Sequence, residues 1–490
     1  MSRLTDAIAA YRGHLPPGET ATFRVDGLDR LGIPVWVVPF RAADGSQFDG
    51  FGYGADPDEA MVGALGEISE QVHAEAAMHA ATRIRGSYNG LVAERGARYV
   101  ADPLTLCLPA GSPYTPDAEL TWVAATRHPT GESVLVPVEF AAVHRGQLRG
   151  VTPLITPISN GLGAGLCREQ AVVHGLLELL QRDGNTVSFR ALDQGTVIDC
   201  GNDLDPQTAG LLNRLRGAGL NVTVKLAAAD FGTVNVYVVG DDLSEPGFPM
   251  MLTACGEAAH PDRNVAVRKA LLEYAAARSR KAFMHGPLDR VAAVAPAGYL
   301  NAYLAKFTTA GEEPRALSAM AGWLTKSAGE LRGLLAGSAF SERRRVNLAD
   351  LPTADPAAVA DPRDRCRVVS DALIEGGCDI CVLDFSPPGG RVFATKVVVA
   401  GLECETMSYY RLGERGVRRL LERGDKFVGL GDGPTGALPV RLTSVAVERL
   451  GGPAWLDPAA VDAIVGPLYP LYREPNSHAA QLVPARRGTA

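Results

Sequence analysis

The sequence predicts a mixed α/β fold that contains three repeated strand–helix modules. One helical phrase, with Ala five positions before Leu and seven before Glu, occurs in residues 60–67, 171–178 and 266–273. A strand-like run precedes each phrase, and a glycine-rich stretch precedes the first two. Because internal repetition indicates a repeated structural unit, we expect three similar strand–helix units.

The composition is that of a large globular protein. Its 490 residues are 46% hydrophobic and 21% charged, so the chain can bury an extensive core and exceeds the usual size of one domain. The net charge of −7 provides no basic surface for nucleic acid or an anionic membrane. The first residues lack the apolar stretch of a signal peptide, and no apolar run approaches the roughly 18 residues of a membrane span. We therefore expect a cytoplasmic protein with no nucleic-acid or membrane partner.

Strand signals occur along most of the chain. Residues 34–48 alternate apolar and polar side chains, and the glycines of 52–54 then break this pattern as a turn before the first repeated helix. Residues 120–140 hold two apolar runs around a His-Pro-Thr-Gly turn, which predicts a hairpin. Further strands are predicted at 222–226, 234–239, 380–385 and 396–399. Residues 286–365 lack strand signals and predict a helical insertion, and 431–490 form a small C-terminal appendage.

The eight cysteines are too sparse and irregularly spaced for a disulfide framework, so we expect reduced thiols. They are Cys107, Cys167, Cys200, Cys255, Cys366, Cys378, Cys381 and Cys404. Cys378 and Cys381 have CxxC spacing, but they lead into an apolar strand-like run and no second CxxC completes a zinc site. Core packing is therefore the favoured interpretation of this pair.

The repeated helices carry carboxylates on otherwise apolar faces. An unpaired carboxylate is costly there, so Glu67 and Glu178 each need a partner, a cation or solvent. Glu70 and Gln181 follow three positions later on the same faces, which gives pairs of oxygen ligands of the kind magnesium prefers. The alternative is a solvated helix face on which Glu178 simply pairs with Arg182.

Glycine-rich residues lie before the first two repeated helices, at 50–54 and 161–165. Glycines before a helix let backbone N–H groups approach an anion, and the helix dipole assists. Neither stretch is a Walker A loop or a full GxGxxG fingerprint, so a plain tight turn is an equally good interpretation.

Residues 156–165 have the sequence Thr-Pro-Ile-Ser-Asn-Gly-Leu-Gly-Ala-Gly, and Glu-Leu-Leu-Gln-Arg-Asp follows from Glu178. This phrase resembles the signature of the YcaO family, in which Ser-Asn-Gly leads to a helix carrying Glu-x-x-Glu-Arg. Residues 52–70 are similar to the preceding Gly-Lys-Gly and Glu-x-x-Glu element of that family. Glu273 with Arg278 is similar to its third helix, which ends in an arginine.

Residues 27–35 and 397–403 also resemble the opening and closing strands of the family. The resemblance implies a YcaO-like fold over residues 25–430, with three strand–helix modules around a nucleotide site and the helical insertion at 286–365. An N-terminal helical lead-in at 1–24 and the appendage at 431–490 complete the expected domain division.

The resemblance implies ATP and Mg²⁺ as cofactors. The implied metal ligands are Glu67, Glu70 and Glu178. The implied nucleotide-binding residues are Glu67, Asn160, Gln170, Gln181, Arg182, Glu273 and Arg278, with the arginines on the phosphates. No catalytic base is assigned, since His73, His174, His260 and His285 are each more typical of surface or core histidines.

The implied activity is ATP-dependent phosphorylation of a peptide backbone amide, which makes an azoline or a thioamide in a ribosomally made peptide. The implied partners are a precursor peptide, a leader-binding or TfuA-like protein, and a second copy of the chain. Tyr53, Gly63 and Gln181 depart from the lysine, serine and glutamate of the family pattern. The alternative function is therefore a non-catalytic scaffold of the same fold that binds peptide or a partner protein.

Overall fold

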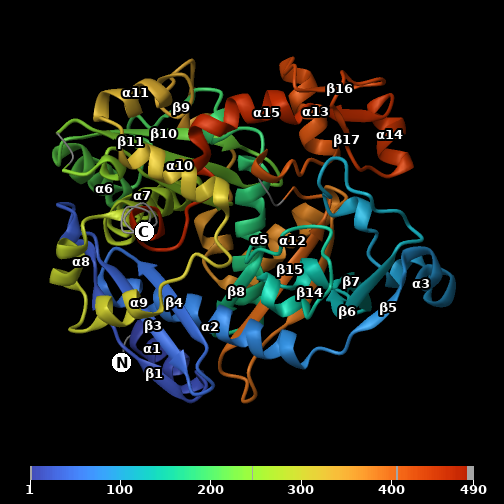
Figure 1. Cartoon of the computed structure of the whole chain (residues 1–490), viewed down its shortest axis with the longest axis horizontal. Helices are drawn as coiled ribbons and strands as arrows, with labels where there is room; N and C mark the ends of the chain where they lie inside the picture. The colour runs from blue at the N-terminus through green and yellow to red at the C-terminus, as the bar shows by residue number, and fades with distance from the viewer. Residues whose placement is uncertain (1–2, 245–246, 404–406, 483–490) are drawn as a thin grey trace, which may run out of the picture.

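The computed structural model describes residues 3–244, 247–403 and 407–482, and the described strands form four sheets (Figure 1). The first sheet lies near the N-terminus and contains β1 (Gly18–Thr20), β2 (Phe23–Arg24), β3 (Val35–Ala42) and β4 (Gln47–Tyr53). Helix α2 (Pro57–Ala80) packs on this sheet and against α1 (Arg3–His14). The α2 helix begins where Asp56 accepts hydrogen bonds from two backbone N–H groups of the first turn.

The second sheet has the strand order β5–β6–β14–β15–β8, with β7 beside β6. Its strands are β5 (Ile84–Ser87), β6 (Glu119–Arg127), β7 (Ser133–Pro137), β8 (Leu162–Gly165), β14 (Asp379–Asp384) and β15 (Phe393–Ala400). Its accompanying helices are α3 (Tyr88–Arg95), α4 (Val138–Ala141), α5 (Arg168–Asn185) and α12 (Pro362–Glu375). The predicted hairpin is the antiparallel pair β6–β7, and β14 and β15 are the two strands predicted in the last third of the chain.

The third sheet has the order β12–β11–β10–β9–β13. Its strands are β9 (Thr196–Asp199), β10 (Leu220–Ala228), β11 (Val234–Asp242), β12 (Cys255–His260) and β13 (Arg344–Asn347). Helices α6 (Pro206–Gly217) and α7 (Arg263–His285) pack on it. Strands β10 and β11 confirm the two predicted in this region.

The segment 286–365 is mostly helical, but the prediction that it lacks a strand is wrong. Its helices are α8 (Leu288–Val294), α9 (Tyr299–Lys306), α10 (Pro314–Leu324) and α11 (Ala328–Ala336). Strand β13 then pairs in parallel with β9 at the edge of the third sheet. Its two exposed arginines, Arg344 and Arg345, leave only one apolar residue in the strand, so the hydrophobic pattern does not reveal it.

The C-terminal region forms a small fourth sheet with its own helices, at the upper right of Figure 1. The elements are α13 (Glu414–Arg423), β16 (Val428–Leu430), β17 (Leu438–Pro439), α14 (Ser444–Leu450), β18 (Ala454–Leu456) and α15 (Pro458–Val465), followed by the 3-10 helix η10 (Gly466–Leu471). Beyond η10 the chain returns to the third sheet, where the backbone N–H of His478 donates to the carbonyl of Met284 on α7. The domain boundaries near residues 25 and 431 stay predictions.

The three repeated helices are α2, α5 and α7, and each packs closely on the strand that precedes it: β4, β8 and β12. Glycines permit this approach. A Cβ atom on Gly52 would lie 2.0 Å from the carbonyl oxygen of Ala60, and one on Gly163 would lie 2.0 Å from that of Ala171. A Cβ atom on Gly256 would lie 2.0 Å from the carbonyl oxygen of Ala270. The predicted triplication into strand–helix modules is therefore confirmed.

The interpretation of the two glycine-rich stretches as turns is partly wrong. Gly50 and Gly52 lie inside strand β4, and Gly163 and Gly165 lie inside β8. Their function in the fold is close strand–helix packing, which needs the missing side chain rather than an unusual backbone angle. Gly161, with φ +88°, is a true turn residue just before β8.

No disulfide joins any two of the described cysteines, which exclude Cys404. Cys378 and Cys381 are buried in the hydrophobic core, which confirms the packing interpretation. No helix in the described ranges is both long and apolar enough to cross a bilayer.

Candidate nucleotide site

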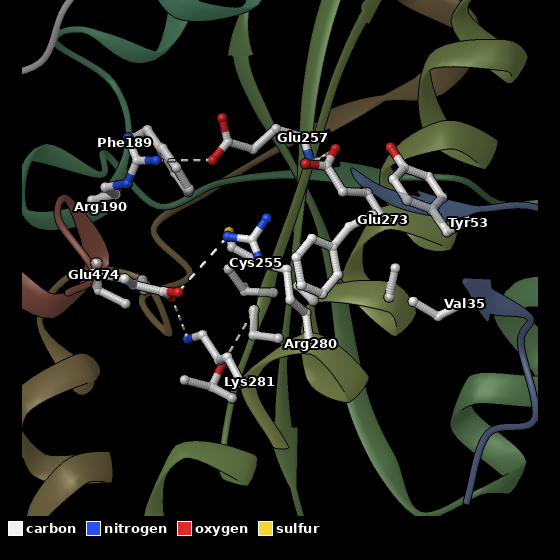
Figure 2. Close-up of a pocket in the computed structure, with 18 of the residues that line it drawn as sticks. Val35, Tyr53, Phe189, Arg190, Cys255, Glu257, Glu273, Arg280, Lys281 and Glu474 are labelled. Atoms are coloured by element: carbon white, nitrogen blue, oxygen red, sulfur yellow. Dashed lines mark hydrogen bonds and ion pairs between the residues drawn. The ribbon is translucent and has the colours of Figure 1, made fainter. Parts of the chain in front are cut away.

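A cavity of about 360 Å³ lies where the first and third modules meet the end of α5 and the C-terminal segment (Figure 2). Strand β4 contributes Tyr53, β12 contributes Glu257, and α7 contributes Glu273. Apolar side chains, among them Phe51 and Phe189, line part of the wall. The cavity therefore combines an apolar surface with convergent charged groups, which is typical of a ligand site.

Each repeated glutamate is held by a backbone N–H of its own module, either in the strand or, for Glu178, in the turn just before it. The carboxylate of Glu67 accepts a hydrogen bond from the Phe51 N–H at 2.6 Å, and that of Glu178 accepts one from the Gly161 N–H at 2.9 Å. Glu273 accepts from the N–H of Glu257 at 3.0 Å. The repeat thus preserves one function of the glutamate, which is to join helix and strand where the site is built.

Glu257 is the centre of the charged network, and sequence reasoning missed it. Its carboxylate accepts hydrogen bonds from Gln181 at 3.0 Å, from Arg182 at 3.1 Å and from Arg190 at 3.1 Å, and another from Asn185. Burial opposes its ionisation, but Arg190 and Arg182 hold the pKa of Glu257 below its ordinary value. An acidic residue in an otherwise small and apolar strand was the signal that could have indicated it.

The three predicted metal ligands are half-buried carboxylates, and two of them, Glu67 and Glu70, have raised pKa values. Burial raises the pKa of Glu67 to about 7, and the nearby charge of Glu178 adds to this effect. Burial and the charge of Glu178 also raise the pKa of Glu70 well above its usual range. A bound cation would relieve this repulsion, so the oxygen donors fit Mg²⁺ chemically.

These three carboxylates do not form a compact cluster by themselves. Within the described ranges, no three His, Cys, Asp or Glu side chains are grouped closely enough to hold a metal ion. Glu70 lies 3.8 Å from the ring of His174, and Glu178 lies 3.4 Å from Arg182, the alternative pairing considered from the sequence. The metal assignment of Glu67, Glu70 and Glu178 stays a prediction.

The structure brings Arg182 and Glu273 to the cavity but puts Arg278 elsewhere. Arg278 is fully buried, donates to Asp29 at 2.8 Å and to Asp242 at 2.9 Å, and also donates to a backbone carbonyl. Arg280, two positions further along α7, lines the cavity instead. Two positions rotate a side chain by roughly 200° around a helix, so the two arginines face opposite ways.

Three other predicted nucleotide contacts do not line this cavity: Asn160, Gln170 and Gln181. Asn160 lines a separate small cavity beside Leu179 and Lys396. Gln170 accepts a hydrogen bond from the N–H of Leu166 at 3.0 Å and so fixes the turn between β8 and α5. Their roles toward a nucleotide stay predictions.

The departures from the family pattern have structural explanations in two cases. Gln181 donates its amide to Glu257, where a glutamate would set a second carboxylate against the first. Tyr53 lies beside Glu273, and burial together with that carboxylate raises the pKa of Tyr53 well above its usual range. Gly63 is exposed on α2 near Gly52, and nothing in the structure explains it.

The family model for YcaO cyclodehydratases, described as binding ATP and Mg²⁺, matches residues 51–403. The chain therefore belongs to the YcaO family, as the sequence resemblance indicated. ATP and Mg²⁺ are the cofactors of this family, so that prediction is confirmed as well.

Three curated relatives are uncharacterised proteins. One from Methanothermobacter thermautotrophicus is 31% identical over 274 residues, which cover 55% of this chain and 67% of the relative. One in the tfuA 3′ region of Rhizobium leguminosarum bv. trifolii is 28% identical, over 57% of this chain and 66% of the relative. One from Mycobacterium tuberculosis is 28% identical, over 54% of this chain and 57% of the relative. The chain thus spans between 57% and 67% of the lengths of these relatives.

Two solved structures share the fold at low sequence identity. A heterocyclase in complex with substrate and cofactor gives a TM-score of 0.61 at 16% identity, over 86% of this chain and 55% of that one. YcaO from Methanopyrus kandleri, bound with AMPPCP and Mg²⁺, gives a TM-score of 0.57 at 19% identity, over 84% of this chain and 94% of that one. They confirm the predicted mixed α/β YcaO fold.

Proposed function

We propose that this chain uses ATP and Mg²⁺ to activate a backbone amide of a ribosomally made peptide, giving an azoline or a thioamide. A nucleophile adds to the amide carbon, the amide oxygen takes the terminal phosphoryl group of ATP, and the oxygen then leaves as phosphate. Family membership supports this activity, and the convergence of the three modules carries it. Glu67 and Glu273 line one cavity, and the charge of Glu178 is near enough to Glu67 and Glu70 to raise the pKa of both.

Glu67 lines the cavity, whereas Glu70 on α2 and Glu178 on α5 lie outside its lining. Glu67, Glu70 and Glu178 would hold Mg²⁺, which neutralises the charge of the transferring phosphoryl group when bound. Arg182 and Arg280 would face the phosphates, with Arg280 in the place first assigned to Arg278. Glu257 orients Arg182 and is a positioning residue.

A groove beside the cavity supports a peptide substrate. It measures about 620 Å³ and runs between the first sheet and helix α9. Phe51 lines both the groove and the cavity, so a chain lying in the groove would end at the charged groups. Tyr299 and Tyr303 supply aromatic surface along it, which suits apolar peptide side chains.

The relative in the tfuA 3′ region supports the thioamide branch and a TfuA-like partner. The azoline branch is supported by the cyclodehydratase description of the family. A leader-binding partner and a homodimer stay predictions, as does the cytoplasmic location.

Phosphate release in the presence of short peptides encoded beside the gene tests this function. We expect release that depends on peptide and falls by roughly 100-fold or more in Glu67→Gln and Glu178→Gln, because each loses a negative oxygen ligand. The control Glu422→Gln changes an exposed glutamate on α13 and should not alter the rate. Mass spectrometry separates the products, since an azoline loses water and a thioamide exchanges oxygen for sulfur.

Unchanged release in both glutamate variants would refute the proposal. Peptide binding without any phosphate release would favour the scaffold, which the altered Tyr53, Gly63 and Gln181 would then explain.

A further inference from the structure

A group of basic side chains at the end of α7 surrounds one carboxylate from the C-terminal segment. Glu474 lies 3.8 Å from Arg280, 3.9 Å from Lys281 and 3.5 Å from His285. Arg280, Lys281 and Glu474 all line the candidate nucleotide cavity, and Figure 2 shows their charged ends pointing toward one another. We call Arg280, Lys281 and His285 the basic cluster.

Two members of the basic cluster are buried, and all three make only long contacts with Glu474. The side chains of His285 and Lys281 are 0% and 8% exposed. All three distances to Glu474 exceed those of good hydrogen bonds. Among the described residues, neither ring nitrogen of His285 nor the Oε2 atom of Glu474 has a hydrogen-bond partner. Buried polar atoms without partners are unfavourable, so the cluster is suited to a better ligand.

The charges indicate which ligand that is. Glu474 supplies one negative charge and two oxygens for two permanent cations and an imidazole. A phosphoryl group carries up to two negative charges and three terminal oxygens, so it can pair with every member of the cluster. Burial lowers the pKa of Lys281, which a more highly charged anion would counteract.

We propose that the basic cluster binds a phosphoryl group, and that Glu474 occupies this site in the ligand-free chain as a built-in competitor. The inference rests on the proposed function, since the phosphoryl group is that of ATP or of the phosphorylated amide. It extends the phosphate contact expected of Arg280 to two further basic side chains of α7, Lys281 and His285. Release of Glu474 accompanies binding, so the C-terminal segment adjusts the affinity of the site.

The backbone around Glu474 is anchored on both sides. The hydroxyl of Tyr472 accepts from the N–H of Ala191, and the N–H of His478 donates to the carbonyl of Met284. Replacement of Glu474 by a phosphoryl group therefore needs only rotation of the Glu474 side chain. An anchored competitor also keeps a high effective concentration, so it weakens anion binding measurably.

Calorimetric titration of the full chain with pyrophosphate, in the absence of magnesium, tests the inference. Glu474→Gln should bind pyrophosphate about tenfold more tightly than the wild type, because the competing charge is removed. Lys281→Met should weaken binding by at least about tenfold. The matched control is Glu312→Gln, since Glu312 accepts from the N–H of Asn476 on the same segment but does not line the cavity. It should bind like the wild type.

Weaker or equal binding by Glu474→Gln would overturn the inference. Should that variant fail to fold, Glu474→Asp withdraws the carboxylate by one methylene and should also tighten binding, and equal binding by it would be equally fatal. Titration with a non-hydrolysable ATP analogue and Mg²⁺ separates the two proposals. Loss of analogue binding in Glu67→Gln, with no change in Glu474→Gln or Lys281→Met, would sustain the proposed function and reject the inference. If pyrophosphate binds more tightly to Glu474→Gln and more weakly to Lys281→Met, but the analogue does not bind at all, the inference would stand and the proposed function would be rejected.

Discussion

Arg278→Met is expected to lower the free energy of unfolding by about 3–5 kcal/mol, because it leaves the buried Asp29 without its arginine and removes one of the two arginines that pair with the buried Asp242. The side chains of Asp29 and Asp242 are 2% and 1% exposed, and both pair with Arg278, which is itself fully buried. Denaturant titration measures the change. The effect is structural and needs no ligand.

Arg280→Met is the matched variant, since it removes the same charge from the same helix. Its side chain is 48% exposed and pairs only loosely with Glu474, so we expect stability to change by less than about 0.5 kcal/mol. Binding of a Mg²⁺–nucleotide analogue should instead be weakened. A stable Arg278→Met protein that had lost nucleotide binding would contradict this assignment and restore Arg278 as the phosphate contact.

Glu257→Gln should lower the free energy of unfolding by about 3 kcal/mol at pH 7, because Arg182 and Arg190 lose a buried anionic partner. Glu273→Gln changes a carboxylate on α7 that lines the same cavity, and it should lower the free energy of unfolding much less. Burial raises the pKa of Glu273 to about 7, so that side chain is already partly neutral at this pH. Denaturant titration of both variants gives the comparison, and equal losses would refute the distinction between the two carboxylates.

The sequence alone predicted the parts of the fold that depend on local pattern. The repeated phrase in 60–67, 171–178 and 266–273 identified the three modules, because Ala, Leu and Glu occupy fixed positions against a glycine-bearing strand. Alternating apolar runs likewise located the hairpin β6–β7 and strands β10 and β11. Strand β13 escaped prediction, since its exposed arginines carry no hydrophobic pattern.

The remaining site residues depend on contacts between distant parts of the chain. Arg278 and Asp29 are 249 positions apart, and nothing local to either residue signals their pairing. The family resemblance indicated Arg278 as a phosphate contact, but it could not say which face of the helix would meet the cavity. Glu474 enters the cavity from the C-terminal segment, far in sequence from the modules that form the other walls. Such placement follows from tertiary packing and not from any motif.

We propose that the three glutamate-bearing modules build one magnesium-dependent nucleotide site. Calorimetric titration with a non-hydrolysable ATP analogue, with and without Mg²⁺, tests it most directly in the wild type and in Glu178→Ala. We expect the wild type to bind the analogue only with Mg²⁺, and Glu178→Ala not to bind it. Absence of binding in the wild type, or undiminished binding in Glu178→Ala, would contradict it.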